Sequence, residues 1–382
     1  MNIVQYNLTT TTKEGGVETF VWELSRHLAR RGHTVTIIGG AGRISRSVPG
    51  VRVLRFPFVD RMGWRAVRPL RRHFELTKLL ERLSLMPAAV PNTLALRPQI
   101  VHLHKPYDFV IGPLMHAIGA RVIYHGHGED FYPFDQIFAR TADLTLSCSG
   151  YNAQTIAARY GGRPEVVFNG FDDELFRPQP RDPELAAALL KPGERALMLI
   201  ARLQPWKGVQ YAIEALRLLV PDRPVRLLIG GAGTYRPALE RLTAELGLSE
   251  HVTFLGNIPH HDVPRYYALA DIVLGQSFAS ETFGMALCEA LGCERPVIAS
   301  DWAGYREVAL DGETGLVTPM QSPPALAAAI ERLLDDPELA QRLARQGRER
   351  VNRLFTWAAV TDRVEAAYRR LLQQDDRASM LE

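Results

Sequence analysis

Short apolar runs alternate with amphipathic segments along the chain. Near the N-terminus, the runs NIVQYNL and HTVTIIGG flank a polar loop and the segment TFVWELSRHLARRG. Within that segment Phe20, Leu24 and Leu28 recur at helical spacing, and Gly32 stands where a helix commonly ends. Further strand-like runs follow at QIVHLH, RVIYHG and ADLTLSCS. This alternation predicts a parallel sheet with crossover helices.

The same pattern begins again in the second half of the chain, with the strand-like runs ALMLIARL, VRLLIGG, HVTFLG, DIVLGQ and PVIASD. A proline-rich segment, 176–183, separates the two series and is typical of a linker. A chain of 382 residues also exceeds the usual size of a single core. We therefore predict two Rossmann-like α/β domains, over residues 1–175 and 176–355, and a C-terminal helical segment over 356–382.

Composition narrows the class of protein. The chain has 46% apolar and 23% charged residues, as is ordinary for a globular enzyme, and its net charge of +3 argues against a general nucleic-acid binder. The N-terminus lacks a signal-peptide pattern, and no apolar run has the length of a membrane-spanning helix. The three cysteines are too few and odd in number for a disulfide framework, so we expect a cytoplasmic protein.

Two carboxylates stand out in the segment SETFGMALCEALGCERPVIASD. Glu281 and Glu289 are eight residues apart, which places them about two turns apart on roughly one face if the segment is helical. Gly284 has no Cβ and lets a ligand approach the backbone closely. Helix capping and a solvated face would explain the spacing alone. The other motifs of the chain favour a binding role.

Five further motifs accompany this segment in order: KEGGVE, HGHGED, VVFNGFDDELFRP, ARLQPWKG and GGAGTYRPALERL. Together they resemble the family 4 retaining glycosyltransferases, also called glycosyl transferases group 1, over nearly the whole chain. The resemblance implies the GT-B fold, in which two Rossmann-like domains face each other across a central cleft and the C-terminal helix crosses back to the first domain. It implies an acceptor-binding first domain and a second domain that binds a nucleoside diphosphate sugar.

The resemblance also implies roles for residues of the second domain. Arg202 and Lys207 follow the strand ALMLIA and would bind the diphosphate, where positive charge stabilises the leaving phosphate. Glu281 would engage hydroxyls of the donor sugar, and Glu289 those of the ribose. The remaining donor contacts would come from the backbone of Thr282, Phe283 and Gly284.

In the first domain, Gly15 and Gly16 precede the first helix, whose N-terminus could receive a phosphate. His125 follows the strand RVIY and resembles a histidine that family members carry in the cleft. His127 is two residues further on, so the register within HGHGED stays open. We favour His125 as the catalytic residue because it is nearest the end of the strand.

Metal ligation is the alternative role for the neighbouring histidines. His102 with His104, and His260 with His261, could share an ion, but no cluster of cysteines or carboxylates accompanies them, and an Asp-x-Asp triad is absent. We therefore predict no metal and no other cofactor, with cationic side chains in the place of a metal ion. The resemblance implies retention of anomeric configuration by front-face substitution, with no carboxylate nucleophile.

A basic segment in the first domain, residues 60–83, is a second candidate feature. If it is helical, an apolar stripe that includes Trp64 and Phe74 lies mostly apart from its arginines, as in an interfacial helix. Pro69 would interrupt a continuous helix, and solvated arginines on a core helix remain the alternative. Membrane contact here would place the protein on the inner face of the cell membrane and favour a lipid-linked acceptor.

The predicted activity is hexosyl transfer from a UDP-sugar, favoured on frequency alone, to a sugar, glycolipid or small-molecule acceptor in bacterial cell-surface polysaccharide or glycolipid synthesis. The alternatives are a GT-B epimerase and a non-catalytic sugar-nucleotide-binding protein. Three positions near the proposed site depart from the family pattern: Gln276 replaces a frequent proline, Glu294 a common glycine, and Ala303 the first residue of a typical Gly-Gly. These changes bear on the identity of the donor.

Overall fold

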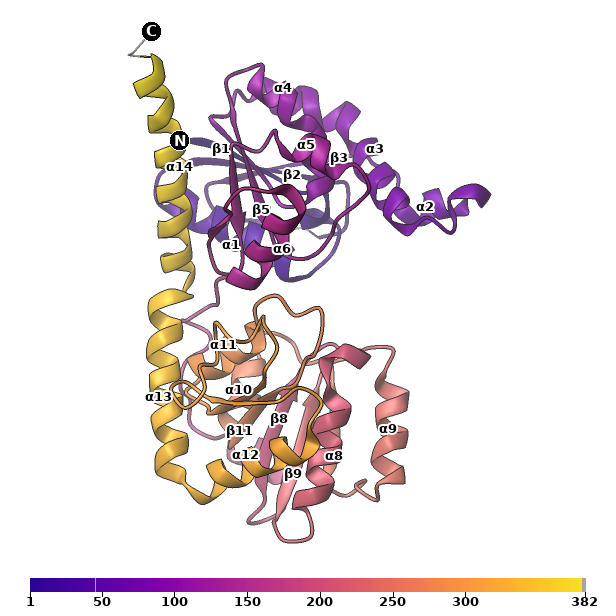
Figure 1. The fold of residues 1–382 in the computed structure, drawn as a ribbon, viewed down its shortest axis with the longest axis vertical. Coiled ribbons are helices and arrows are strands. Elements are labelled where there is room, and N and C mark those ends of the chain that lie inside the picture. The colour runs from indigo at the N-terminus through magenta and orange to yellow at the C-terminus, as the bar shows by residue number, and fades with distance from the viewer. Residues whose placement is uncertain (45, 380–382) are drawn as a thin grey trace. The chain divides into compact units, whose positions relative to one another are not determined.

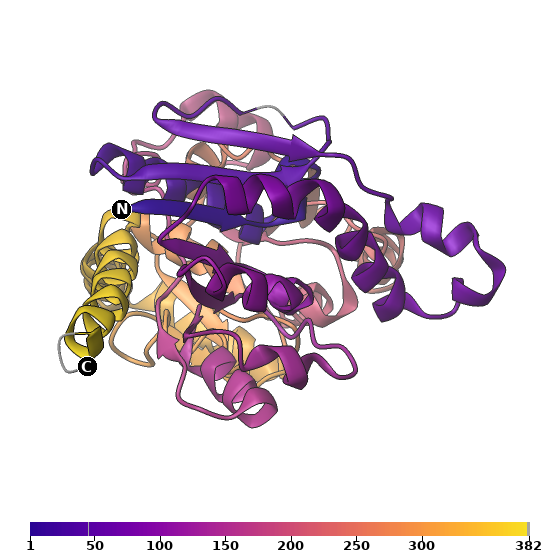
Figure 2. The ribbon, with the colours of Figure 1, turned by 90° about the horizontal axis from the view of Figure 1, so that it is seen from above.

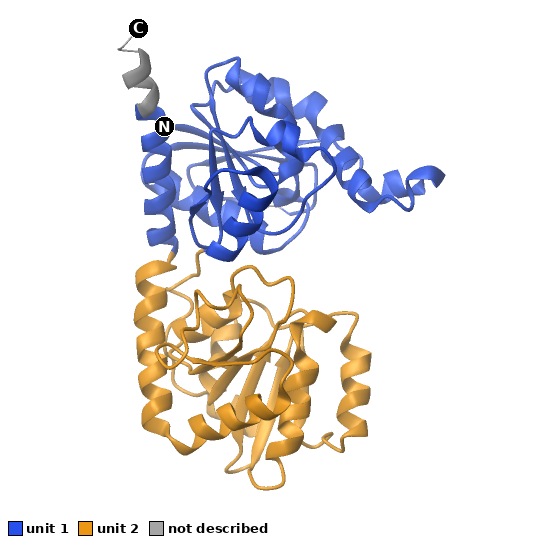
Figure 3. Ribbon diagram, in the orientation of Figure 1, with its two compact units in different colours: residues 1–169, 357–382 blue, residues 170–356 orange. Residues whose placement is uncertain are grey.

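The computed structural model describes residues 1–44 and 46–379, and the side chains up to residue 373. The chain forms two compact units (Figures 1 and 3). Unit 1 comprises Met1–Asn169 and the segment from Trp357 onward, and unit 2 comprises Gly170–Thr356. Each unit is a parallel sheet covered by helices, as the alternating pattern of the sequence predicts.

Unit 1 contains a seven-stranded sheet in the order β3-β2-β1-β4-β5-β6-β7. The strands are β1 (Asn2–Tyr6), β2 (Thr34–Gly40), β3 (Val51–Phe56), β4 (Ile100–Leu103), β5 (Arg121–Gly126), β6 (Leu144–Ser147) and β7 (Glu165–Val166). The helices are α1 (Gly16–Arg30), α2 (Arg61–Ala66), α3 (Phe74–Ala95), α4 (Gly112–His116), α5 (Asp135–Ala139), α6 (Gly150–Tyr160) and α14 (Trp357–Ser379). The strand order reverses between β1 and β4, and ligands bind at such points in open α/β sheets.

The C-terminal helix α14 packs on unit 1, which confirms the predicted return of the chain to its first domain. Val360 and Val364 of α14 share a core cluster with Phe20, Leu24 and Leu28 of α1. The guanidinium of Arg31 also contacts acidic side chains of α14. The predicted C-terminal segment began at residue 356, whereas the helix begins at Trp357, and residues 380–382 lie outside the described part of the chain.

Unit 2 contains a six-stranded sheet in the order β10-β9-β8-β11-β12-β13, with the reversal between β8 and β11. The strands are β8 (Arg195–Ile200), β9 (Val225–Gly230), β10 (Val252–Gly256), β11 (Ile272–Gly275), β12 (Val297–Ser300) and β13 (Leu316–Thr318). The helices are α7 (Pro183–Leu189), α8 (Val209–Leu219), α9 (Arg236–Glu245), α10 (Val263–Leu269), α11 (Met285–Gly292), α12 (Pro323–Asp335) and α13 (Pro337–Leu354). Apolar side chains of α8 and α12 cover the sheet in one core cluster.

The division between the units lies at Asn169 and Gly170, ahead of the predicted boundary at 175/176. The segment 170–176 belongs to unit 2 because its apolar side chains are buried there. Phe171 and Phe176 are each 1% exposed, and the amide of Phe171 donates to the carbonyl of Phe355 at 2.9 Å. Part of the segment 176–183, predicted as a linker, therefore contributes to the core of unit 2.

The basic segment 60–83 does not form one continuous helix. Helix α2 ends at Ala66, a short 3-10 helix follows over Arg68–Leu70, and α3 begins at Phe74. Pro69 lies at the break, as expected from its missing N–H and fixed φ. Helix α2 projects away from the sheet of unit 1 (Figures 1 and 2). Among the described helices, none combines the length and apolar character needed to cross a membrane.

Candidate functional site

Two loops at the strand reversal of unit 2 carry most of the predicted site. Arg202 and Lys207 follow β8, and Lys207 ends a short 3-10 helix, Pro205–Lys207. Glu281 and Gly284 follow β11, and Gly284 is the N-cap of α11. Because β8 and β11 are adjacent and parallel, both loops leave the sheet at the same edge. The structure therefore brings these predicted residues to one region of unit 2.

Lys207 and Glu281 form an ion pair in this region. Lys207 Nζ lies 2.5 Å from Glu281 Oε2, and the two side chains are only 10% and 20% exposed. The second carboxylate oxygen of Glu281 accepts from the amide of Gly284 at 3.2 Å. Charge-assisted hydrogen bonds of this kind are stronger than those between neutral groups. The carboxylate is therefore held by two donors, one of which begins α11.

Close backbone contacts hold the loops around this pair. A Cβ on Gly208 would lie 1.9 Å from the carbonyl oxygen of Gln276, and one on Gly304 would lie 2.0 Å from that of Glu281. The indole N–H of Trp302 donates to the same Glu281 carbonyl at 2.7 Å. Glycine at 208 and 304 thus lets the loops pack backbone against backbone. The position of Glu281 depends on these contacts.

Arg202 lies on the same loop as Lys207 but is exposed. Its loop is supported by the loop after β9, where a Cβ on Gly231 would lie 1.9 Å from the carbonyl oxygen of Ala201. The amide of Leu203 also donates to the carbonyl of Ala232 at 2.9 Å. A fixed backbone with a guanidinium directed to solvent suits a residue that binds an anion from solution.

The second predicted carboxylate, Glu289, lies on α11 and has a partner that the sequence did not reveal. Its Oε1 lies 3.1 Å from His260 Nε2, and the Glu289 side chain is 13% exposed.

Two residues of the predicted donor loop differ from each other in burial. Thr282 is partly exposed, whereas the ring of Phe283 is 1% exposed and packs edge-on against Phe355. Only the backbone of Phe283 is suited to contact a ligand.

Gly15 and Gly16 lie in unit 1, where Gly15 is the N-cap of α1. The carboxylate of Glu18, in the first turn, lies beside this N-terminus, because a Cβ on Gly15 would meet Glu18 Oε2 at 2.5 Å. Glu18 is 4% exposed, and Lys13 Nζ lies 3.6 Å from its other oxygen. An acidic side chain is favourable at a helix N-terminus. A phosphate at the predicted position would have to compete with this carboxylate.

Of the two histidines in HGHGED, the structure favours His127 for contact with a ligand. His125 lies within β5 and is completely buried, and burial lowers its pKa to about 3. The Val167 backbone lies close enough to oppose that shift, but within the described residues neither ring nitrogen makes a hydrogen bond of normal geometry. His127 lies beyond the strand and is partly exposed. A strand residue near the sheet end can face the core, which explains the burial of His125. The assignment of His125 as the catalytic residue stays a prediction, with His127 as the alternative.

His127 is oriented by a chain of hydrogen bonds. His104 Nε2 lies 2.7 Å from Gln5 Oε1, so it carries the proton, and His104 Nδ1 then accepts from His127 Nε2 at 3.2 Å. The Gln5 amide donates to the hydroxyl of Tyr368 on α14 at 3.4 Å. Burial lowers the pKa of His104 well below its usual range, and the neighbouring histidines add to this shift. This order of hydrogen bonds places a proton on His127 Nε2.

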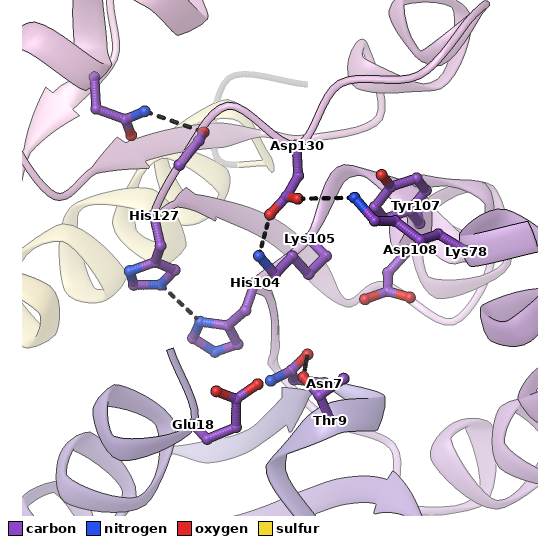
Figure 4. A network of polar contacts seen from close by, with 12 residues as sticks. Asn7, Thr9, Glu18, Lys78, His104, Lys105, Tyr107, Asp108, His127 and Asp130 are labelled. Atoms are coloured by element: carbon purple, nitrogen blue, oxygen red, sulfur yellow. Dashed lines mark hydrogen bonds and ion pairs between the residues drawn. The ribbon is translucent and has the colours of Figure 1, made fainter. Parts of the chain in front are cut away.

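A network of polar contacts adjoins these histidines in unit 1 (Figure 4). Asp130 binds the ammonium groups of Lys105 and Lys78, the latter at 3.4 Å. Although burial opposes the shift, the two ammonium groups lower the pKa of Asp130 to about 2. None of these three residues was among the predicted site residues. The sequence feature that indicates the network is the position of Lys105 and Asp130, which follow the neighbouring strands β4 and β5.

The histidine pairs considered as metal ligands have other contacts. His102 and His104 stack with ring centroids 4.4 Å apart, and the hydroxyl of Tyr368 lies 2.6 Å from His102 Nδ1. His260 contacts Glu289, and His261 lies 3.6 Å from Asp262. Within the described residues, no group of three or more His, Cys, Asp or Glu is placed to hold a metal ion.

Comparison with known proteins yields matches over most of the chain. Residues 180–350 match the family Glycosyl transferases group 1, and residues 14–175 match Glycosyltransferase Family 4. The chain is 33% identical over 263 residues to the GDP-mannose-dependent alpha-(1-6)-phosphatidylinositol monomannoside mannosyltransferase of Mycolicibacterium smegmatis, covering 63% of this chain and 68% of that protein. It is 29% identical over 398 residues to the D-inositol 3-phosphate glycosyltransferase of Mycobacterium bovis, covering 95% and 80% respectively.

Two solved structures match at similar levels. Anabaena Alr3699/HepE in complex with UDP has a TM-score of 0.79 at 23% identity, over 96% of this chain and 99% of that one. Sucrose-phosphate synthase from Thermosynechococcus elongatus has a TM-score of 0.77 at 23% identity, over 97% and 99%. At this identity the matches bear on the fold alone, and they confirm the predicted GT-B fold class.

Proposed function

Because this chain belongs to glycosyltransferase family 4, the glycosyl transferases group 1, we propose that it transfers a hexose-type sugar from a nucleoside diphosphate sugar to a hydroxyl acceptor. The observation that carries the proposal is the pairing of Lys207 with Glu281 at the strand reversal of unit 2. Arg202, on the same loop as Lys207, adds a second cation. Unit 2 would bind the donor, and unit 1 the acceptor.

The chemistry of the donor explains why a cation and a carboxylate are needed together. Negative charge develops on the leaving diphosphate in the transition state, and fixed positive groups stabilise it. A diphosphate would compete with Glu281 for the ammonium of Lys207. Glu281 would then accept hydrogen bonds from hydroxyls of the sugar, since an ionised carboxylate is only an acceptor. The ion pair thus holds both groups in place before the donor binds.

We propose that transfer retains the anomeric configuration by front-face substitution. The bond between the anomeric carbon and the phosphate oxygen breaks, and a bond to the acceptor oxygen forms on the same face. The acceptor proton passes to the leaving phosphate oxygen. Arg202 and Lys207 supply the charge that a metal ion supplies in other transferases, so we propose that no metal or other cofactor is required.

The relatives and the solved structures name different nucleotide bases for the donor. The M. smegmatis relative is named as GDP-mannose-dependent, whereas the HepE structure holds UDP. UDP-sugars, favoured from the sequence, and GDP-sugars are therefore the first donors to test. The relatives named above are transferases, so the epimerase and regulatory-protein alternatives are not favoured.

The proposed setting is the cytoplasm, in the synthesis of bacterial cell-surface polysaccharide or glycolipid. We propose peripheral contact with the inner face of the membrane through residues 60–83. Two features support that contact. Helix α2 projects from unit 1 (Figure 2), and the segment from Arg61 to Phe74 carries five arginines and no acidic residue.

The proposal is tested by incubating the protein with UDP-, GDP-, ADP- and dTDP-hexoses and octyl glycosides as acceptors, with mass spectrometry of the products. We expect one nucleotide class to yield a glycosylated product in the presence of EDTA, with the anomeric configuration of the donor by NMR. Absence of transfer and of donor cleavage with all four classes, from correctly folded protein, contradicts the proposal. An inverted product contradicts only the mechanism.

A further inference from the structure

An open apolar groove lies on unit 1, where the start of α3 meets the loop before α5. Its volume is about 520 Å³, which is the size of a small-molecule site. Most of its lining is apolar and comes from Phe74, Leu76, Leu79, Tyr132, Pro133 and Phe134. Three of these side chains are unusually open to solvent: Phe74 is 46% exposed, Leu76 42% and Phe134 76%. Exposed apolar side chains gathered in this way mark an interaction site.

Phe134 has an unfavourable backbone conformation that packing within the protein does little to offset. Its φ is +69°, in the left-handed region that residues other than glycine rarely adopt. A bulky side chain in this conformation costs free energy, and a ring that is 76% exposed regains little of it by packing. An aromatic ring at this position is better explained by contact with a ligand.

The groove is continuous with the polar network of unit 1. Glu75 lines the groove and also binds Lys78 at 3.1 Å and the hydroxyl of Tyr107. Tyr132, another lining residue, stacks on Tyr107 with ring centroids 5.0 Å apart. Lys78 then contacts Asp130 in the network beside the histidines (Figure 4). One end of this surface is apolar, and the other is polar and lies at the carboxyl ends of β4 and β5.

Arginines flank the apolar end. Arg61 lies with its guanidinium 5.7 Å from the centre of the Phe74 ring. Four more, Arg65, Arg68, Arg71 and Arg72, lie between Arg61 and the start of α3, and the last three of these are exposed. The sequence has no acidic residue between Arg61 and Phe74, and of the five arginines Arg61 faces the carboxylate of Glu81 on α3. An apolar groove next to exposed arginines is complementary to a hydrocarbon chain attached to an anionic group.

We propose that this groove receives the hydrocarbon chain of a lipid-anchored, phosphate-bearing acceptor. The chain lies between α3 and the loop at Phe134, the phosphate lies among the arginines, and the polar end of the lipid extends toward Lys78 and Asp130. This inference rests on the proposed transferase function and names the class of its acceptor.

The test uses a fluorescent lysophosphatidylglycerol with a single acyl chain, below its critical micelle concentration, titrated with the full-length protein by anisotropy. We expect saturable binding with one site, weakened at least tenfold in Leu76→Asp and Phe134→Gly. Ile118→Asp is the matched control, because Ile118 is 38% exposed on unit 1 outside the groove, and its affinity should equal that of the wild type. Absence of saturable binding, or equal loss in the control, overturns the proposal.

Two further measurements separate the explanations. Phe134→Gly suits the left-handed backbone, so its melting temperature should not fall, and a large fall would indicate a structural role instead. Binding to phosphatidylglycerol vesicles without binding of the single-chain lipid would make the surface a bilayer contact and overturn the chain-binding groove. A rise in the melting temperature on addition of UDP or GDP, measured on the same protein, reports on donor binding by unit 2 separately. If the wild-type protein shows this rise but does not bind the lipid, the lipid-binding groove alone is overturned. If it binds the lipid but shows no rise with any nucleotide, only the donor function is overturned.

Discussion

Lys207 Nζ lies 2.5 Å from Glu281 Oε2, although the two residues are 74 positions apart in the chain. Each follows a strand at the reversal of the sheet in unit 2, and β8 and β11 are paired there. The pair therefore depends on the strand order of the fold and on no local sequence feature. It places a buried cation and a carboxylate where open α/β sheets bind their ligands.

Replacing either member of this pair should remove most of the activity. We expect Lys207→Ala to lower the rate of sugar transfer by roughly 100- to 1,000-fold, because a fixed positive group is lost from the leaving phosphate. Glu281→Ala should be similarly impaired through loss of the contact with the sugar. Lys191→Ala is the control, since Lys191 is an exposed lysine of the same unit. Full activity in either site variant, with the fold verified by thermal melting, contradicts the assignment.

Gly304→Ala should impair the enzyme without touching a charged group. The new methyl would lie 2.0 Å from the carbonyl oxygen of Glu281, so the two loops would have to separate. We expect weaker donor binding and a rate at least tenfold lower, since small displacements of catalytic groups are costly. Lys191→Ala is again the control, because Lys191 is an exposed lysine of the same unit. Steady-state kinetics of the two variants test this, and unchanged kinetics for Gly304→Ala would be inconsistent with it.

Glu294→Gly should stabilise the protein. Glu294 follows the C-terminus of α11 with φ +56°, and the amide of Arg295 donates to the carbonyl of Ala290, as in a helix end that prefers glycine. Relief of the left-handed conformation is worth about 1 kcal/mol. The lost ion pair with Arg348, at 3.3 Å and partly exposed, offsets only part of this. Chemical denaturation measures the difference in the free energy of unfolding between Glu294→Gly and the wild type. A clear loss of stability in the variant would contradict the inference that position 294 prefers glycine.

Acidification should destabilise unit 1 below about pH 6.5. Burial lowers the pKa of His102, His104 and His125 in the folded chain. The unfolded chain therefore binds more protons as the pH falls below the ordinary value near 6.5, and stability decreases by up to about 1.4 kcal/mol per pH unit for each histidine. The stability is fully present above that pH.

Melting temperatures between pH 7.5 and 5.5 test this dependence. In His125→Leu the slope against pH should be smaller than in the wild type, because one buried imidazole is removed. His261→Gln should keep the wild-type slope, since His261 is largely exposed on unit 2. Identical slopes for all three proteins would contradict the role assigned to the buried histidines.

The parallel-sheet architecture of both units could be predicted from the alternation of apolar runs and amphipathic segments. The positions of Arg202 and Lys207 after a strand, and of Glu281 before a helix, are also local features of the sequence. What could not be predicted is their pairing. The contact of Lys207 with Glu281, and that of Glu289 with His260, depend on which strands are neighbours and on how the loops pack.

The choice between His125 and His127 shows a second limit. His125 is the nearer of the two to the end of the predicted strand, but only the course of the backbone shows that it lies inside β5 and is buried, whereas His127 lies beyond β5 and is partly exposed. The same holds for the boundary between the units. The proline-rich composition of 176–183 suggested a linker, but burial of Phe171 and Phe176 decides the boundary.

We propose that unit 2 binds a nucleoside diphosphate sugar through Arg202 and Lys207. The most direct measurement is a thermal-shift titration with UDP, GDP, ADP, dTDP and their hexose conjugates, on the wild type, Arg202→Ala and Lys191→Ala. A ligand at 100 times its Kd stabilises the native state by about 2.7 kcal/mol. We predict a saturable rise in melting temperature with one nucleotide class, kept in Lys191→Ala and lost in Arg202→Ala. No rise with any nucleotide, or an equal rise in Arg202→Ala, would contradict the claim.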